Sequence, residues 1–136
     1  KMVMGFFQDD IESDLARGDI IRDAQALTGG ILLGRYGVDR PDANRLAAQA
    51  ADTMANMRGV EGAFVVYIQG GEVNVSARST GDMNVQVILE SLGGGGHLNA
   101  AGAKLKHESL ESAMAEIAGA VQDYFRYEAR GAAEGA

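Results

Sequence analysis

The chain has 136 residues, of which 46% are hydrophobic and 23% charged, enough for one folded domain with a core of its own. Its net charge of −7 counts against a broad electrostatic grip on a nucleic-acid backbone, and therefore against long nucleic acid as a partner. The lack of cysteine excludes disulfides, thiolate metal sites and cysteine nucleophiles, and no apolar run is long enough to span a membrane.

Residues 1–24 are expected to form a helix that connects this domain to an upstream domain that is missing here. Apolar side chains recur there at roughly helical spacing among acidic ones: Phe6, Phe7, Ile11, Leu15 and Ile20. The chain opens with Lys1-Met2 rather than an initiator methionine, which suggests a piece of a longer protein. Without its neighbour, the apolar face of this helix is expected to be exposed and to favour self-association.

The next residues predict a strand followed by a helix. Residues 31–36 are a short apolar run typical of a strand, and the turn signal at 39–42 includes the only proline, Pro41. A helix is predicted over residues 41–58, with proline in its first turn. Its apolar face is expected to pack on the sheet and consists of Ala43, Leu46, Ala47, Ala50, Met54 and Met57.

Residues 63–68 and 72–78 alternate like two strands and are joined by Gln69-Gly70-Gly71, so they predict a hairpin. In the second strand, Val73, Val75 and Ala77 share one face. Asn74, Ser76 and Arg78 share the other, which places Arg78 at the strand end of a polar face. A solvated charge is the alternative interpretation of this arginine.

Four consecutive glycines, residues 93–96, followed by His97, are the most informative stretch. A short helix is predicted before them over residues 84–92, capped by Asn84, and an extended segment after them over residues 103–106. Because glycine adopts positive φ and lets a ligand approach the main chain, Gly94, Gly95 and Gly96 are interpreted as a backbone cradle for a phosphate. A flexible linker, the alternative, would lack apolar periodicity on both sides.

Nearby side chains complete the predicted site. Arg78 suits bidentate phosphate recognition, with Ser79 beside it. His97 either donates to the phosphate or is satisfied by nearby carbonyls, and Asn99 supports the loop or contacts a base. No carboxylate cluster has ligand spacing with His97 or with His107, which is expected on the surface, so no metal site is predicted.

A long amphipathic helix is predicted from Ser109 onward, and a disordered tail over residues 131–136. The apolar positions of the helix are Leu110, Ala113, Met114, Ile117, Ala118, Val121 and Phe125. Residues 25–130 then make one domain of α/β class, with α+β as the alternative: a small mixed sheet with helices packed on it and a glycine-rich loop after a short helix.

Three motifs resemble one family. Ser76-Ala77-Arg78-Ser79, the run at 81–87 and the glycine run with His97 are similar to the C-terminal, DHH-associated domain of DHH-family phosphoesterases, over residues 25–125. Within that family, they resemble the GdpP-type cyclic-di-AMP phosphodiesterases more than RecJ-type exonucleases or oligoribonucleases. The runs at 50–54 and 62–66 resemble the same subgroup.

The resemblance implies a division of labour. In such enzymes two divalent metal ions, usually manganese, sit in a separate DHH domain, and the associated domain binds substrate phosphate and nucleotide. Arg78 and the Gly94–His97 loop would hold phosphate here. The DHH signature is absent from the chain, so we expect it to bind but not to cleave, and to contain no catalytic residue of its own.

The same resemblance implies hydrolysis of cyclic-di-AMP to pApA by the full-length protein, which would carry this domain on the cytoplasmic side of N-terminal membrane helices. Two alternatives stay open. One is a short-oligonucleotide exonuclease of the same superfamily, acting on linear dinucleotides. The other is a non-catalytic module that binds nucleotide through the glycine loop.

Overall fold

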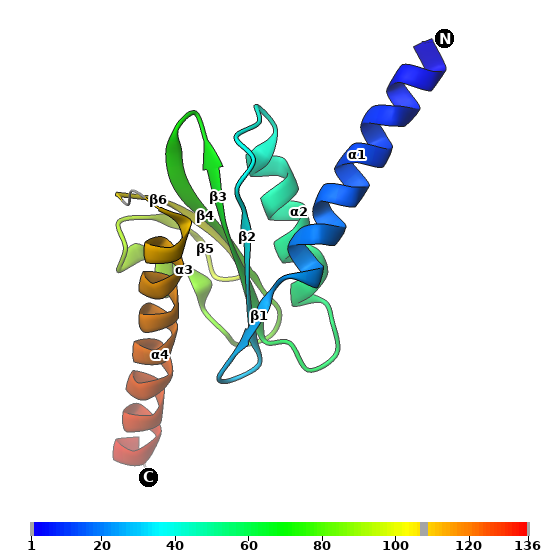
Figure 1. The fold of residues 1–136 in the computed structure, drawn as a ribbon. Coiled ribbons are helices and arrows are strands. Elements are labelled where there is room, and N and C mark those ends of the chain that lie inside the picture. The colour runs from blue at the N-terminus through cyan, green and yellow to red at the C-terminus, as the bar shows by residue number, and fades with distance from the viewer. Residues whose placement is uncertain (1, 107–108, 136) are drawn as a thin grey trace.

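The computed structural model describes residues 2–106 and 109–135, and of residues 2–10 and 132–135 only the backbone (Figure 1). His107, expected on the surface, lies outside these ranges. The helices are α1 (Met2–Arg22), α2 (Ala43–Ala55), α3 (Val85–Glu90) and α4 (Leu110–Gly135). The strands are β1 (Gln25–Leu27), β2 (Ile31–Tyr36), β3 (Gly62–Gln69), β4 (Glu72–Ser79), β5 (Gly95–His97) and β6 (Ala100–Leu105).

The strands form one six-stranded mixed sheet in the order β1-β2-β3-β4-β6-β5. Strands β2 and β3 are parallel and are joined through α2, whereas every other neighbouring pair is antiparallel. Helices α1 and α2 lie on one face of the sheet, and α3 and α4 lie on the other (Figure 1). The predicted fold class, a small mixed sheet with helices packed on it, is therefore confirmed.

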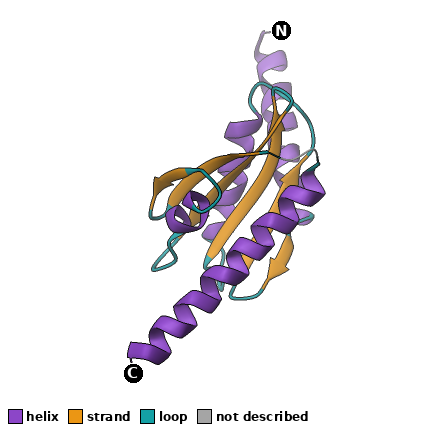
Figure 2. Cartoon of the chain, turned by 90° about the vertical axis from the view of Figure 1, so that its left-hand side faces the viewer, coloured by secondary structure: helices purple, strands orange, loops and turns teal. Residues whose placement is uncertain are grey.

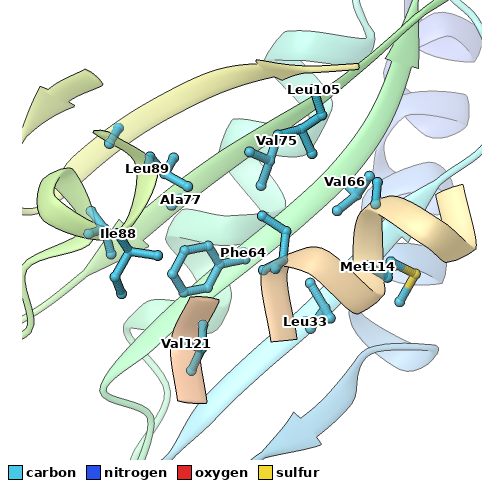
Figure 3. Close-up of a cluster of buried hydrophobic side chains, with 14 of the residues drawn as sticks. Leu33, Phe64, Val66, Val75, Ala77, Ile88, Leu89, Leu105, Met114 and Val121 are labelled. Atoms are coloured by element: carbon cyan, nitrogen blue, oxygen red, sulfur yellow. The ribbon is translucent and has the colours of Figure 1, made fainter. Parts of the chain in front are cut away.

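The larger core lies between the sheet and the pair α3 and α4. Figure 3 shows Phe64 at its centre, with Ala77 and Val75 from β4, Ile88 from α3 and Val121 from α4 around it. The predicted periodicity of α4 explains the packing, because the residues on its sheet-facing side are buried: Ala113, Met114, Ile117 and Val121. Ser109 caps this helix as predicted, since its hydroxyl accepts from the backbone N–H of Ser112 at 3.1 Å.

The second core lies under α2. Its predicted apolar residues Leu46, Ala50 and Met54 are fully buried, but Met57 is 38% exposed. The prediction for Met57 was wrong because α2 ends at Ala55, and the chain turns away before reaching it. The short edge strand β1 was not predicted, since three residues carry too little alternation to be recognised.

The two end helices extend beyond the sheet. The N-terminal part of α1 projects away from the body (Figure 1), while Ile20 near its other end is buried against the second core. Ile11 and Leu15 are 43% and 64% exposed, and the side chains of Phe6 and Phe7 lie outside the described part. Helix α4 crosses the sheet and continues to Gly135 (Figure 2), whereas we expected disorder from residue 131.

Candidate functional site

The tight β3–β4 hairpin fixes the register of the strand that carries Arg78. Gly70 and Gly71 have φ of 61° and 75°, values that glycine adopts without strain and that a two-residue hairpin turn with matching twist requires. The carboxylate of Asp39 accepts hydrogen bonds from both of their backbone N–H groups at 2.8 Å. Every residue from Glu72 to Ser79 then pairs with β3, which sets which side chains of β4 face α2.

The sheet register brings Arg78 and His97 to the same face. Arg78 pairs with Ala100 on β6, and Ala100 pairs in turn with His97 on β5. Directly paired residues share a face, and each step between antiparallel strands spans about 5 Å, so the two Cα atoms lie roughly 10 Å apart. The methyl group of Ala100 is the only side chain between them in this row, which leaves room for a ligand to contact both.

The next row on this face has almost no side chains. It runs from Ser76 through Gly102 to Gly95. A Cβ at Gly95 would meet no atom within 4 Å, and one at Gly102 would meet only the carbonyl of Val75, at 3.4 Å. Glycine inside a strand often marks a place where a ligand or another backbone approaches closely. Here the two glycines form a flat floor of main chain beside Arg78 and His97.

A third row adds residues that the sequence analysis did not assign to the site. Tyr67, Asn74 and Lys104 are paired across β3, β4 and β6 on this same face. Lys104 is exposed, with its ammonium 3.7 Å from the carboxylate of Glu72. The alternating positions of Ala100, Gly102 and Lys104 in the sequence indicate that they share one face of a strand. Only the pairing with β4 shows that this is the face of Arg78.

The guanidinium of Arg78 is held along its own strand. Its Nη1 donates to the carbonyl of Ala77 at 2.8 Å and to Ser76 Oγ at 3.4 Å, and the side chain is half-buried. Its charge also reaches Tyr67: burial raises the pKa of the Tyr67 hydroxyl, and the positive charge of Arg78 opposes that rise. The arginine is thus ordered on the face before any anion arrives.

The four glycines have different surroundings. Gly93 N–H donates to Glu90 O and Gly94 N–H to Leu89 O, the paired bonds of a Schellman motif that ends α3, with Gly93 at φ 87°. A Cβ at Gly94 would lie 2.3 Å from Gly102 O, and one at Gly96 would lie 2.5 Å from Ala100 O. Packing therefore requires glycine at both. A Cβ at Gly93 or at Gly95 would meet no atom within 4 Å, but the positive φ of Gly93 itself favours glycine, so Gly95 is the member of the run that neither packing nor backbone conformation restricts to glycine.

This arrangement differs from the predicted loop between a helix and an extended segment. The run begins in the turn after α3, as expected, but Gly95 and Gly96 belong to strand β5 and pair with β6. The close approach of Gly94 and Gly96 to β6 accompanies this pairing, because glycine lets their main chain lie against Gly102 and Ala101 without a clashing Cβ. The part open to a ligand is thus narrower than the run itself.

Two further predicted site residues are engaged within the chain. Ser79 is 6% exposed and points to the side of β4 opposite Arg78, where its hydroxyl donates to the carbonyl of Met83 at 2.7 Å. Asn99 lies in the β5–β6 turn, and its Nδ2 donates to Ser79 Oγ at 2.9 Å. We call the side of β4, β6 and β5 that carries Arg78, Gly102 and His97 the open face. Of the seven predicted residues, it brings together three: Arg78, Gly95 and His97.

Metal binding finds no support among the residues that the structure describes. Their histidine, aspartate and glutamate side chains form no group of three or more that is able to hold an ion. The open face instead carries hydrogen-bond donors: the cationic side chains of Arg78 and Lys104, the imidazole of His97 and the main chain at Gly95 and Gly102. Such a set suits a phosphate, which combines negative charge with several acceptor oxygens.

Comparison with known proteins gives a consistent result. The model of the DHHA1 domain family matches residues 36–123. The cyclic-di-AMP phosphodiesterase PdeA of Listeria monocytogenes is 35% identical over 128 residues, which cover 93% of this chain and 20% of that protein. The cyclic-di-AMP phosphodiesterase GdpP of Geobacillus thermodenitrificans is 37% identical over 125 residues, covering 91% and 19%. The chain thus spans about a fifth of the length of these curated relatives.

Among solved structures, an exopolyphosphatase-related protein from Bacteroides fragilis superimposes with a TM-score of 0.71. The match covers 82% of this chain and 34% of that one, at 16% sequence identity. At that identity the likeness concerns the fold alone.

Proposed function

This chain belongs to the DHHA1 domain family, and from that premise we propose that it is the substrate-binding part of a cyclic-di-AMP phosphodiesterase that releases pApA. Support comes from the two cyclic-di-AMP phosphodiesterases that match more than nine-tenths of the chain. The observation that carries the proposal is the row in which Arg78 and His97 flank Ala100 on one open face.

Each part of that face has a task in the proposal. Arg78 and His97 donate to oxygens of one phosphate, and each charge-assisted hydrogen bond contributes about 1.5–3 kcal/mol. The main chain at Gly95 and Gly102 lets the ligand lie against the sheet, because no Cβ lifts it away. The floor is preorganised, since its register is fixed by continuous pairing of β4 with β3 and β6.

The hydrolytic chemistry is assigned to another part of the full-length protein. Cleavage in this family is proposed to need two divalent ions, manganese by resemblance, and the described residues of this chain do not fit such a centre. We place the ions in a DHH domain of the same polypeptide, to which α1 would lead. The present chain then binds substrate phosphate but does not cleave it.

The proposal extends to the setting of the domain. Within the described part of the chain, no helix combines the length and the apolar character that crossing a bilayer requires. By the GdpP resemblance, we place the domain on the cytoplasmic side of a protein whose membrane anchor belongs to another segment. The exposed Ile11 and Leu15 on α1 offer an apolar surface for the DHH domain or for self-association.

Calorimetric titration of this chain with cyclic-di-AMP, pApA and inorganic phosphate tests the proposal. We expect saturable binding of cyclic-di-AMP, weaker binding of phosphate alone, and a loss of affinity in His97→Ala. Tighter binding of pApA than of cyclic-di-AMP would favour a short-oligonucleotide exonuclease instead. Binding of none of the three would contradict the assignment of a preformed phosphate site to the open face.

A further inference from the structure

The β5–β6 turn is tied to the segment that follows β4 by a compact set of hydrogen bonds. Ser79 N–H donates to the carbonyl of Asn99 at 3.0 Å, and Asn99 Nδ2 donates back to Ser79 Oγ at 2.9 Å and to the carbonyl of Gly81 at 3.4 Å. One residue away, Val85 N–H donates to the carbonyl of Leu98 at 3.0 Å. We call the reciprocal pair of Ser79 and Asn99 the latch.

The latch adds to the other contacts of a short edge strand, which are its ladder with β6 and its packing against α3. Strand β5 has three residues, two of them glycine, and it lies at the edge of the sheet with β6 as its neighbour. Short edge strands rich in glycine are weak, because they make few ladder bonds and have few side chains to pack. His97 is the last residue of β5 and is followed at once by the turn that the latch fixes.

The hydrogen-bond donors of both latch side chains are committed inside the chain. A carboxamide nitrogen has two protons, and Asn99 Nδ2 has two acceptors, on Ser79 and Gly81. The single proton of the Ser79 hydroxyl goes to Met83 O, at 2.7 Å, while its oxygen accepts from Asn99. Neither group is left to donate to a phosphate without breaking these bonds.

We propose that Ser79 and Asn99 are positioning residues: their mutual hydrogen bonds lock the β5–β6 turn onto the end of β4 and so set the distance and direction from His97 to Arg78. The proposal rests on the proposed function in one respect, because it takes the pair of His97 and Arg78 as the phosphate grip. It revises the expectation that Ser79 and Asn99 contact the ligand themselves.

Hydrogen exchange tests the latch without any ligand. In Asn99→Ala and Ser79→Ala, we expect the amides of β5 and of the paired part of β6 to exchange about tenfold faster, which corresponds to the loss of roughly one net hydrogen bond. The amides of β3 should keep their protection. Asn56→Ala is the matched control, since the side chain of Asn56 donates only to Asp52 O at the end of α2. Unchanged exchange in β5 would overturn the proposal.

A double-mutant cycle separates positioning from direct contact. We expect Asn99→Ala to weaken cyclic-di-AMP binding by several fold, and Asn99→Ala with His97→Ala to bind no worse than His97→Ala alone. Losses that multiply would show that Asn99 acts independently of His97, and the proposal would fall. Ser79→Thr keeps the hydroxyl and should restore most of the affinity lost in Ser79→Ala, which a purely steric role would not predict.

The two proposals can fail separately. If the unchanged chain binds neither cyclic-di-AMP nor pApA nor inorganic phosphate, the proposed function fails, and hydrogen exchange in β5 still decides whether the latch orders the strand that bears His97. If the unchanged chain binds nucleotide but both latch variants keep full affinity, the open face stands as a phosphate site and the positioning role is excluded.

Discussion

The two faces of strands β4 and β6 are built for different tasks. On one face Val75, Ala77 and Leu105 are buried under α3 and α4. On the other, Arg78, Gly102 and Lys104 alternate with them, and helix α2 packs on this side of the sheet against β2, β3 and β4. Because successive side chains of a strand point to opposite faces, the same strand contributes apolar side chains to the core and polar side chains to the candidate site.

The comparison teaches which substitutions are separable. Apolar burial stabilises by about 25 cal/mol per Å² of area removed from water, so on β4 and β6 the side under α3 and α4 contributes more to the folding free energy than the other side. The open face has small or polar residues, which bury little apolar area, and its glycines reduce stability. We therefore expect changes on the first face to lower stability and changes on the second to lower ligand affinity.

Phe64→Ala should have the largest effect. The ring is fully buried at the centre of the core under α3 and α4 (Figure 3). Removing it is expected to lower the unfolding free energy by about 3–5 kcal/mol, because apolar burial is lost and a cavity remains. Urea denaturation followed by circular dichroism measures it. The molecules that remain folded should bind cyclic-di-AMP as before, and Phe64→Leu should lose less. A loss below about 1 kcal/mol would show that the two faces do not divide the work in this way.

Arg78→Ala should show the reverse pattern, with a large loss of affinity and little loss of stability. Losing one charge-assisted hydrogen bond of about 1.5–3 kcal/mol weakens phosphate binding roughly ten- to a hundredfold. Titration calorimetry with cyclic-di-AMP measures the change. Arg35→Ala is the matched control, because Arg35 is an arginine of the same sheet whose guanidinium pairs instead with Glu111 of α4 at 3.0 Å. Equal losses in both variants would point to bulk charge rather than to a site.

The sequence was sufficient to predict the elements whose signal is local. The apolar period of α4, the caps at Asn84 and Ser109, and the β3–β4 turn all follow from residues within a few positions of one another. The polar face of β4 was also predicted correctly, because strand alternation alone determines that Ser76 and Arg78 share it.

The rest depends on contacts distant along the chain. The composition of the glycine run predicts a loop. Only the structure shows that Gly94 packs against β6, where an added Cβ would lie 2.3 Å from Gly102 O. Likewise, Ser79 follows Arg78 directly in the sequence, which predicts that it belongs to the same site. In the structure its hydroxyl instead accepts a hydrogen bond from Asn99, twenty residues further along the chain. Propensity has no access to such pairings, which the tertiary structure decides.

Two adjacent glycines offer a finer test of the same division. Gly94→Ala places a Cβ against Gly102 O and Ala103 Cβ and should lower the unfolding free energy by about 1–3 kcal/mol through overpacking. Gly95→Ala meets no atom within 4 Å and should change stability by less than about 0.5 kcal/mol. Its methyl group would nevertheless stand on the ligand floor, so it should weaken cyclic-di-AMP binding.

Thermal unfolding measures the stability of the two glycine variants, and calorimetric titration measures their affinity for cyclic-di-AMP. Both substitutions add one methyl group, at Gly94 just before β5 or at Gly95 in its first position, so each variant is the other's control. If Gly95→Ala bound cyclic-di-AMP with unchanged affinity, the ligand would have to lie elsewhere than on the floor formed by Gly95 and Gly102.

The smallest expected effect concerns Tyr67, which lies on the open face but is half-buried. Burial raises the pKa of its hydroxyl above the ordinary value of 10.0, with the charge of Arg78 acting against the rise. The unfolded chain therefore releases this proton at lower pH than the folded one, so the contribution of Tyr67 is fully present below pH 10.0 and is lost as the pH rises further. Urea titrations between pH 9 and about 11 should show a shallower alkaline loss of stability in Tyr67→Phe than in the unchanged chain.

Tyr127→Phe is the control, because Tyr127 is 76% exposed and its substitution removes a hydroxyl that is not buried. If stability fell with pH in Tyr67→Phe as steeply as in the unchanged chain, the hydroxyl of Tyr67 would not be shielded from water in the folded state.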